Sequence, residues 1–286
     1  MFKTLLLTNK PLALILIRAQ KEVFSSVVGN NNSRQKGEGY DFVELRPYES
    51  GDDSKHIDWM ISSKMNKPHV KVFHPQKELN IAIVALLSGS VYFGTKRLKH
   101  ELITEISALI SYSCVKQNDP FEAYIANEDF FVVSKKSKQL FSVRTLVEKI
   151  SDYGVLGKQM DYKGLVGKLY KTLRQKSLVF LIGDFFDTQD LDLKALAIKH
   201  ELVVIIVRDR FEENPTLLGM LDITDPVTKK SAKIDFNKTN VKNYLKKMQL
   251  QDEILLKQLK KLGIKFVKIF TDENPAQKVL TLMSRR

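Results

Sequence analysis

Short, continuously apolar segments that alternate with stretches of helical period constrain this fold most. Three of the segments are apolar at every position, and a fourth is interrupted only by Lys265 and Lys268. The segments cover residues 81–87, 178–182, 202–207 and 264–270. Continuous apolarity is typical of strands that are covered on both faces, as in a parallel sheet, so the interrupted segment is expected nearer an edge.

Apolar residues recur at helical spacing between these segments. They are Leu98, Leu102, Ile106, Leu109 and Ile110, then Leu165, Leu169 and Leu173, and finally Val241, Tyr244, Leu245, Met248, Leu255, Leu256 and Leu259. Lys and Glu are expected on the opposite face of the first helix, and Gly263 is expected to end the last one. Strands that alternate with helices predict an α/β fold with a doubly wound, mainly parallel sheet. Residues 121–126 and 130–133 predict a hairpin that adds an antiparallel edge.

The first part of the chain has a different pattern. A helical opening is predicted to about Val28, followed by a turn or flexible loop at residues 29–33, a dense polar stretch at residues 37–59 and a strand at residues 69–73. We therefore predict a smaller helix-plus-strand N-terminal segment over residues 1–78 and the α/β domain over residues 79–286.

Charge and cysteine content bound the function. The chain carries 46 Lys+Arg against 33 Asp+Glu, a net charge of +13. The excess of positive charge is consistent with lysines that are dispersed along the chain and have no specific function. It is also consistent with a partner such as nucleic acid or an anionic membrane. The footprint of such a partner would be the helix that carries Lys242, Lys246, Lys247, Lys257, Lys260 and Lys261. The single cysteine, Cys114, excludes a disulfide framework and is expected in the core.

No targeting or membrane-spanning segment is expected. The longest apolar stretch near the start, residues 12–17, is too short to cross a bilayer. Charged residues follow it without a small-residue cleavage site. We therefore expect a cytoplasmic protein, with a weakly amphipathic first helix that could touch a membrane or a partner.

The polar stretch at residues 37–59 is the densest constellation in the sequence. Gly51, Asp52 and Asp53 suit a tight turn. Arg46 has the geometry to bond Asp52, Asp53 or Asp58 through two nitrogens. The only tryptophan, Trp59, is expected to anchor the segment by burial. Three interpretations remain open: a charged turn closed by an Arg–Asp pair, a surface for a partner, or a cation site that lacks the spacing of a calcium loop.

The same stretch resembles the signature of the bacterial "domain of unknown function 58" family. The matching positions are Gly37, Gly39, Phe42, Arg46, Tyr48, Gly51, Asp52, Asp53, Ile57, Asp58 and Trp59. The resemblance continues at residues 70–73, 77–79, 183–185, 207–209 and 222–226, so it covers most of the chain. Lys55 and His56 depart from the residues that relatives usually carry at these positions.

The resemblance implies a fold of von Willebrand factor A type, which often binds Mg²⁺ at the carboxyl ends of its strands. An Asp-x-Ser-x-Ser loop, a Thr and a further Asp supply the ligands in such domains. Here Ser88, Ser90 and Asp184 match, whereas Leu86 and Met160 stand in place of ligands. Because Mg²⁺ prefers carboxylate ligands, we expect a degenerate metal site and no bound cofactor. The alternatives are turn-satisfying hydroxyl and carboxyl groups, or a metal-free contact rim.

The resemblance also implies a function. Members of the family frequently occur with MoxR-type AAA+ ATPases, which implies a non-enzymatic adaptor or co-chaperone of such an ATPase or its client. Arg46, Tyr48, Gly51, Asp52, Asp53, Asp58 and Trp59 would then bind the partner, together with the rim at Ser88, Ser90 and Asp184. The sequence contains no phosphate-binding loop, His-Glu-x-x-His or Gly-x-Ser-x-Gly motif, so no enzyme is expected. The alternative function is binding of nucleic acid or an anionic membrane surface.

Overall fold

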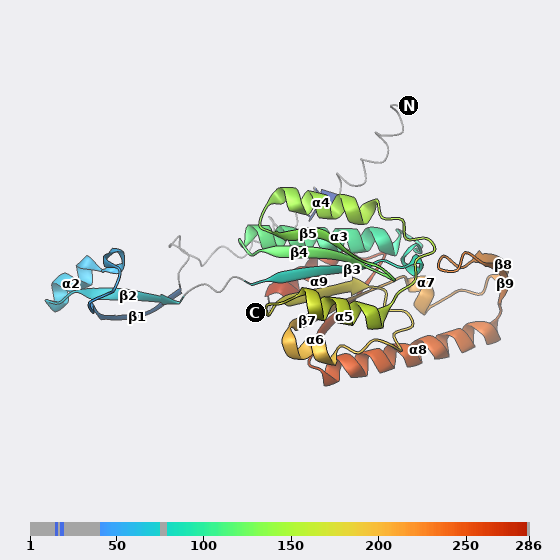
Figure 1. Ribbon diagram of the computed structural model, residues 1–286. Helices are drawn as coiled ribbons and strands as arrows, with labels where there is room; N and C mark the ends of the chain where they lie inside the picture. The colour runs from blue at the N-terminus through green and yellow to red at the C-terminus, as the bar shows by residue number, and fades with distance from the viewer. Residues whose placement is uncertain (1–14, 17, 20–40, 75–78, 285–286) are drawn as a thin grey trace, which may run out of the picture. The chain divides into compact units, whose positions relative to one another are not determined.

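The computed structural model describes residues 15–16, 18–19, 41–74 and 79–284 of the chain (Figure 1). The chain divides into two compact units, of which the smaller comprises residues 30–78 and the larger the remainder. Ile15, Leu16 and Ala19 pack against the core of the larger unit, although we had expected residues 1–78 to form one segment. Each unit is described by itself below.

The small unit is a two-stranded antiparallel sheet with a short helix. Strand β1 (Asp41–Pro47) pairs with β2 (His69–His74), and the register places Asp41 opposite His74. Between them lie the 3₁₀ helix η1 (Ser54–His56) and α2 (Trp59–Met65). Helix α2 ends at Asn66, which adopts the left-handed conformation.

The large unit is built on a six-stranded sheet in the order β10-β7-β6-β3-β4-β5. The strands are β3 (Ile81–Leu86), β4 (Phe121–Ala126), β5 (Phe130–Ser137), β6 (Leu178–Gly183), β7 (Glu201–Arg208) and β10 (Lys265–Phe270). All neighbours are parallel except β4 and β5. The predicted doubly wound, mainly parallel α/β sheet is confirmed, as is its antiparallel edge strand. The interrupted apolar segment forms the opposite edge, β10, as expected.

Alternating residues of the strands face two separate apolar clusters, which is why residues 81–86, 178–182 and 202–207 are apolar at every position. One face packs on α3 (Lys99–Lys116), α4 (Leu140–Ser151) and α9 (Pro275–Ser284). The other packs on α5 (Tyr162–Thr172), α6 (Lys194–Lys199) and α8 (Lys238–Lys261). Figure 1 shows the two helical layers on either side of the sheet.

Helix α3 differs from its predicted form. Its Lys99, His100 and Glu105 are buried, and α4 and α9 pack against the helix. Cys114 lies in its buried face, as predicted. Helix α3 is therefore a central element of the fold and not a surface helix.

Two features complete the large unit. Gly263, at a φ of +65°, follows the long helix α8, and the Ile264 N–H donates back to the Leu259 carbonyl, which confirms the predicted helix end. An antiparallel hairpin of β8 (Gly219–Thr224) and β9 (Ser231–Phe236), preceded by α7 (Arg210–Glu213), was not predicted. No helix in the described ranges combines the length and apolarity that a bilayer crossing needs.

Candidate functional site

The signature turn of the small unit is closed by one ion pair. Arg46 Nη1 and Nη2 donate to the two carboxylate oxygens of Asp52 at 2.8 and 2.7 Å. Asp52 also accepts from the Glu49 N–H at 2.9 Å. Gly51 lies between them at a φ of +114°, a conformation that glycine adopts without a steric penalty. The predicted tight turn and bidentate pair are both present.

The two other acidic residues of the signature begin helices. The Asp53 carboxylate accepts from the Lys55 N–H at the start of η1. Asp58 accepts from the Met60 and Ile61 N–H groups at the start of α2 and forms an ion pair with Lys71 at 2.8 Å. The hydrogen bond from Lys71, followed by that from the Ile61 N–H, lowers the pKa of Asp58. These carboxylates therefore order the backbone and do not converge on a cation site.

Trp59 does not anchor the segment by burial, contrary to our expectation. Its side chain is 71% exposed, and its neighbour Met60 is 68% exposed. Met65 at the other end of α2 is also exposed, and Tyr48 is partly so. The reason is that hydrogen bonds hold the turn and leave α2 free to present apolar side chains to solvent.

The candidate metal residues gather at the carboxyl edge of the large sheet. Ser88 Oγ and Ser90 Oγ lie 2.8 Å apart after β3, and Ser90 hydrogen-bonds the Asp184 carboxylate after β6. Leu86 and Met160 pack in the apolar cluster beneath α5, α6 and α8. The three polar residues therefore lie close together at this edge, whereas the Leu86 and Met160 side chains lie in an apolar environment.

Lys99, which was not among the predicted site residues, fills the centre of this edge. Lys99, the first residue of α3, is 0% exposed, and its ammonium lies 3.1 Å from Asp184 Oδ2 and 2.5 Å from Glu212 Oε1. The same nitrogen lies 4.6 Å from the centre of the Phe186 ring. The ammonium is thus enclosed by two carboxylates and an aromatic face.

Each partner of Lys99 is held in turn. Glu212 accepts from the Asp209 N–H at 2.9 Å, which completes a capping box at the start of α7. The buried Arg208 donates to the Asp184 carbonyl and pairs with Asp252 at 2.9 Å. The Asp-x-x-Glu spacing at residues 209–212 was a usable sequence signal for this capping box.

The electrostatics of the two carboxylates differ. Burial alone would raise the pKa of Asp184, but Lys99, Arg208 and the hydrogen bond from Ser90 outweigh it and lower the pKa. Burial raises the pKa of Glu212, and Lys99 counteracts this only in part. The pKa values of the two carboxylates are therefore shifted in opposite directions.

A divalent cation does not fit the residues present. The Asp184 carboxylate that would bind it is already engaged by the Lys99 ammonium. Asp161, which could have replaced the missing carboxylate, is exposed and caps α5 by accepting from the Gly164 N–H. Within the described ranges no three His, Cys, Asp or Glu side chains are placed to hold a metal ion.

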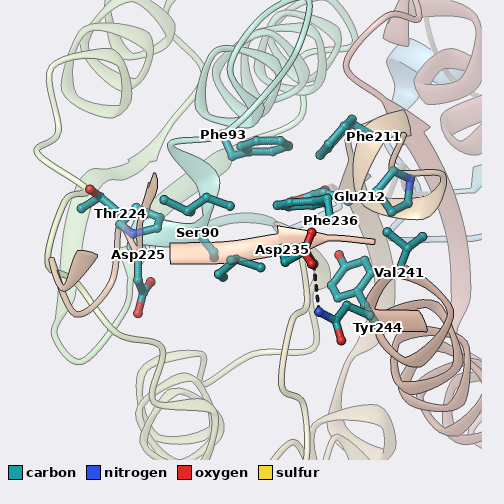
Figure 2. A pocket seen from close by; sticks show the side chains of 15 residues that line it. Ser90, Phe93, Phe211, Glu212, Thr224, Asp225, Asp235, Phe236, Val241 and Tyr244 are labelled. Carbon is teal, nitrogen blue, oxygen red and sulfur yellow. Dashed lines mark hydrogen bonds between the residues drawn. The ribbon is translucent and has the colours of Figure 1, made fainter. Parts of the chain in front are cut away.

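An apolar pocket of about 500 Å³ opens beside this cluster. It is lined by Phe93 after β3, Phe211 of α7, Phe236 of β9 and Tyr244 of α8, with Ser90 and Glu212 in the wall nearest the Lys99 ammonium. Phe211 lies 6.3 Å from Phe93 and 6.1 Å from Phe236, measured between ring centres. Figure 2 shows the aromatic side chains facing the hollow from these separate elements. Ser88 and Asp184 are buried, so Ser90 is the residue of the predicted rim that borders this pocket.

Comparison with known proteins places the chain among uncharacterized relatives. It is 27% identical over 183 residues to the uncharacterized proteins Rv1480 of Mycobacterium tuberculosis and Mb1516 of Mycobacterium bovis, a match that covers 60% of this chain. The match spans 56% of the length of those relatives.

Solved structures overlap with the chain only in part. BatB from Bacteroides thetaiotaomicron overlaps with 73% of this chain at 13% identity and a TM-score of 0.45, over 100% of its own length. The VWA domain of SpRpn10 overlaps with 72% at 8% identity and a TM-score of 0.39, over 95% of its own length. The sheet topology described above, and not these overlaps, defines the fold.

The family assignment rests on a direct match to a family model. Residues 44–254, which include most of the signature turn and the whole cluster around Lys99, match the model described as "Protein of unknown function DUF58". The match extends over more than half of the chain, and it contains the signature positions from Arg46 to Trp59. The chain belongs to the DUF58 family.

Proposed function

We propose that this chain is a non-enzymatic protein-interaction module, an adaptor or co-chaperone of a MoxR-type AAA+ ATPase or of its client. The observation that carries the proposal is the exposure of Trp59 on an ordered signature turn. Tryptophan is enriched among the residues that dominate binding energy at protein interfaces. A surface that is ordered before binding loses little conformational freedom on association.

The polar residues of the signature support this role by fixing the turn. Arg46, Asp52, Asp53 and Asp58 use their charges within the small unit, and α2 presents Trp59 and Met60 outward. The family resemblance supplies the class of partner. The burial of Lys99 and Asp184 supports a role without catalysis, because neither group is accessible to a substrate.

Co-purification tests the proposal. The full chain is co-expressed with the MoxR-type ATPase of the same genome, and the retained ATPase is quantified. We expect Trp59→Ala to weaken retention about tenfold or more, as for an interface hot spot. Phe141→Ala is the matched control, because Phe141 is an aromatic residue that is 73% exposed on α4 of the large unit. Failure of the wild type to retain the ATPase, or equal retention by both variants, would contradict the proposal.

A second candidate function has one specific observation in its favour. Six lysines of α8, namely Lys242, Lys246, Lys247, Lys257, Lys260 and Lys261, are exposed. None of them forms an ion pair with any residue in the described ranges. Such a row of free ammonium groups suits nucleic acid or an anionic membrane surface.

Salt dependence distinguishes this candidate from the first. Binding of a fluorescent duplex or of anionic vesicles should weaken steeply with salt, because phosphate contacts release counterions. Replacing the six lysines with glutamine should reduce the slope, whereas Trp59→Ala should not. Absence of binding at low salt would remove the candidate.

A further inference from the structure

We infer that the ammonium of Lys99 occupies the cation position at the carboxyl edge of the large sheet. Domains of the expected von Willebrand factor A type bind a divalent metal ion at this position. The chain carries its cation covalently, as the first side chain of α3. The inference concerns the large unit alone and is independent of the proposed partner.

The contacts of Lys99 meet the requirements of a cation site. Its nitrogen lies within 3.1 Å of Asp184 and 2.5 Å of Glu212, and the side chain is 0% exposed. A buried ammonium is stable only when it is paired and hydrogen-bonded, and here two carboxylates from different elements supply the pairing. The faces of Phe186 and, at 6.0 Å, Phe93 complete the enclosure with favourable cation–aromatic contacts.

The residues around Lys99 leave no position for a second cation. A divalent ion bound to Asp184 would lie beside the ammonium in a region that excludes water, where like charges repel strongly. Lys99 cannot swing away without breaking two buried ion pairs. Leu86 supplies no carboxylate and Met160 supplies no hydroxyl. Both are expected if the ammonium of Lys99 is the cation, because a monovalent ammonium needs fewer ligands than a divalent metal ion.

Removing the ammonium should therefore convert the edge into a metal site. Without Lys99, two carboxylates and the Ser90 hydroxyl remain around a vacated buried position. Glu212 stays fixed by its bond from the Asp209 N–H, and Asp184 by its bond from Ser90. Oxygen ligands of this kind suit Mg²⁺ or Mn²⁺.

Thermal unfolding of the full chain tests this directly. Wild type, Lys99→Ala and the double variant Lys99→Ala/Asp184→Asn are compared with and without MgCl₂ or MnCl₂. We expect no metal-dependent change in the wild-type Tm. Lys99→Ala should unfold at a lower temperature without metal and gain about 3 °C or more when the metal reaches about ten times its Kd. The double variant should lose that gain.

The opposite results overturn the inference. A wild-type Tm that rises with Mg²⁺ or Mn²⁺ and ceases to do so in Asp184→Asn would mean that the edge binds metal with Lys99 in place. A folded Lys99→Ala that ignores both metals would mean that Lys99 does not hold a cation position. If Lys99→Ala folds in neither condition, calorimetric titration of Mn²⁺ into wild type and Asp184→Asn decides: saturable wild-type binding that the variant lacks refutes the inference, and no binding upholds it.

Discussion

The Arg46 guanidinium and the Asp52 carboxylate form a two-pronged ion pair, with nitrogen–oxygen distances of 2.8 and 2.7 Å, across a glycine turn. The pair joins the end of β1 to the residues that begin η1. Because the same carboxylate accepts the Glu49 N–H, one side chain fixes both the ion pair and the backbone of the turn. The conformation of the turn at residues 46–53 thus depends on Asp52.

Replacing Asp52 with asparagine should loosen this turn without unfolding the large unit. Asparagine keeps the shape but loses the charge and one of the two acceptors that the guanidinium fork uses. Backbone amides of residues 48–57 should exchange faster with deuterium, while those of β6 and β7 should be unaffected. Glu49→Gln is the control, since Glu49 lies 3.9 Å from Arg46 and its side chain is 81% exposed. Equal exchange in both variants would contradict the role given to Asp52.

The close approach of Gly183 to Leu86 predicts a stability coupling. A Cβ atom at Gly183 would lie 2.7 Å from the Leu86 Cβ, so Gly183→Ala should cost about 1–3 kcal/mol of unfolding free energy by overpacking. Leu86→Gly removes that Cβ atom and should relieve the overlap, so the double variant should lose less than the sum of the single losses. Gly154→Ala, where no atom lies within 4 Å, is the control. Strict additivity in denaturant unfolding would contradict the contact.

His100 predicts a loss of stability in mild acid. Burial lowers its pKa, and the hydrogen bond with the Ile150 carbonyl only partly offsets this. Below about pH 6.5, the unfolded chain therefore takes up a proton that the folded chain resists, and the free energy of unfolding falls as the pH decreases. His100→Gln should flatten this part of the profile, measured by denaturant unfolding at pH 7, 6 and 5.

The comparison must be made between variant and wild type at each pH. Glu212, whose pKa burial raises, acts in the opposite sense, and His200, whose pKa burial lowers, adds to the effect of His100. Each remains in the His100→Gln variant. A wild-type profile that the variant reproduces in full would show that His100 is not the titrating group.

We expect that removing the buried charge of Arg208 lowers the free energy of unfolding. Its side chain is buried, pairs with Asp252 and lies with its guanidinium carbon 4.0 Å from the centre of the Phe186 ring. Arg208→Met would leave the Asp184 carbonyl without this donor and Asp252 with Lys268 as its remaining ion-pair partner, and we expect a loss of about 1–3 kcal/mol of unfolding free energy. Arg210→Met, two residues away and more than half exposed, should have only a small effect. Similar losses in the two variants would contradict this assignment.

The sheet could be predicted from the sequence because a strand that is buried on both faces is apolar at successive positions. Strands β3, β6 and β7 were found from continuous apolarity, β4 and β5 as a hairpin, and the edge position of β10 from its two lysines. The hairpin of β8 and β9 was missed because its residues are mostly exposed, so no apolar pattern distinguishes it from a loop.

The candidate site was predicted only in part, for a different reason. Ser88, Ser90 and Asp184 were found through the family resemblance, but Lys99 carries no local sign of burial, since lysine at the start of a helix ordinarily faces water. Its position depends on Asp184 and Glu212, which lie 85 and 113 residues further along the chain. Trp59 was expected inside because tryptophan is usually buried. In the small unit, hydrogen bonds from charged residues order the turn in its place.

The antiparallel register of β1 and β2 has a consequence for how the small unit is joined to the rest of the chain. Asp41 lies opposite His74, so the first and last described residues of the unit are neighbours, with Cα atoms about 5 Å apart. A segment whose first and last residues lie side by side has the geometry of an insertion in the chain. Such a segment can change in length or sequence without altering the distance that the flanking chain must span.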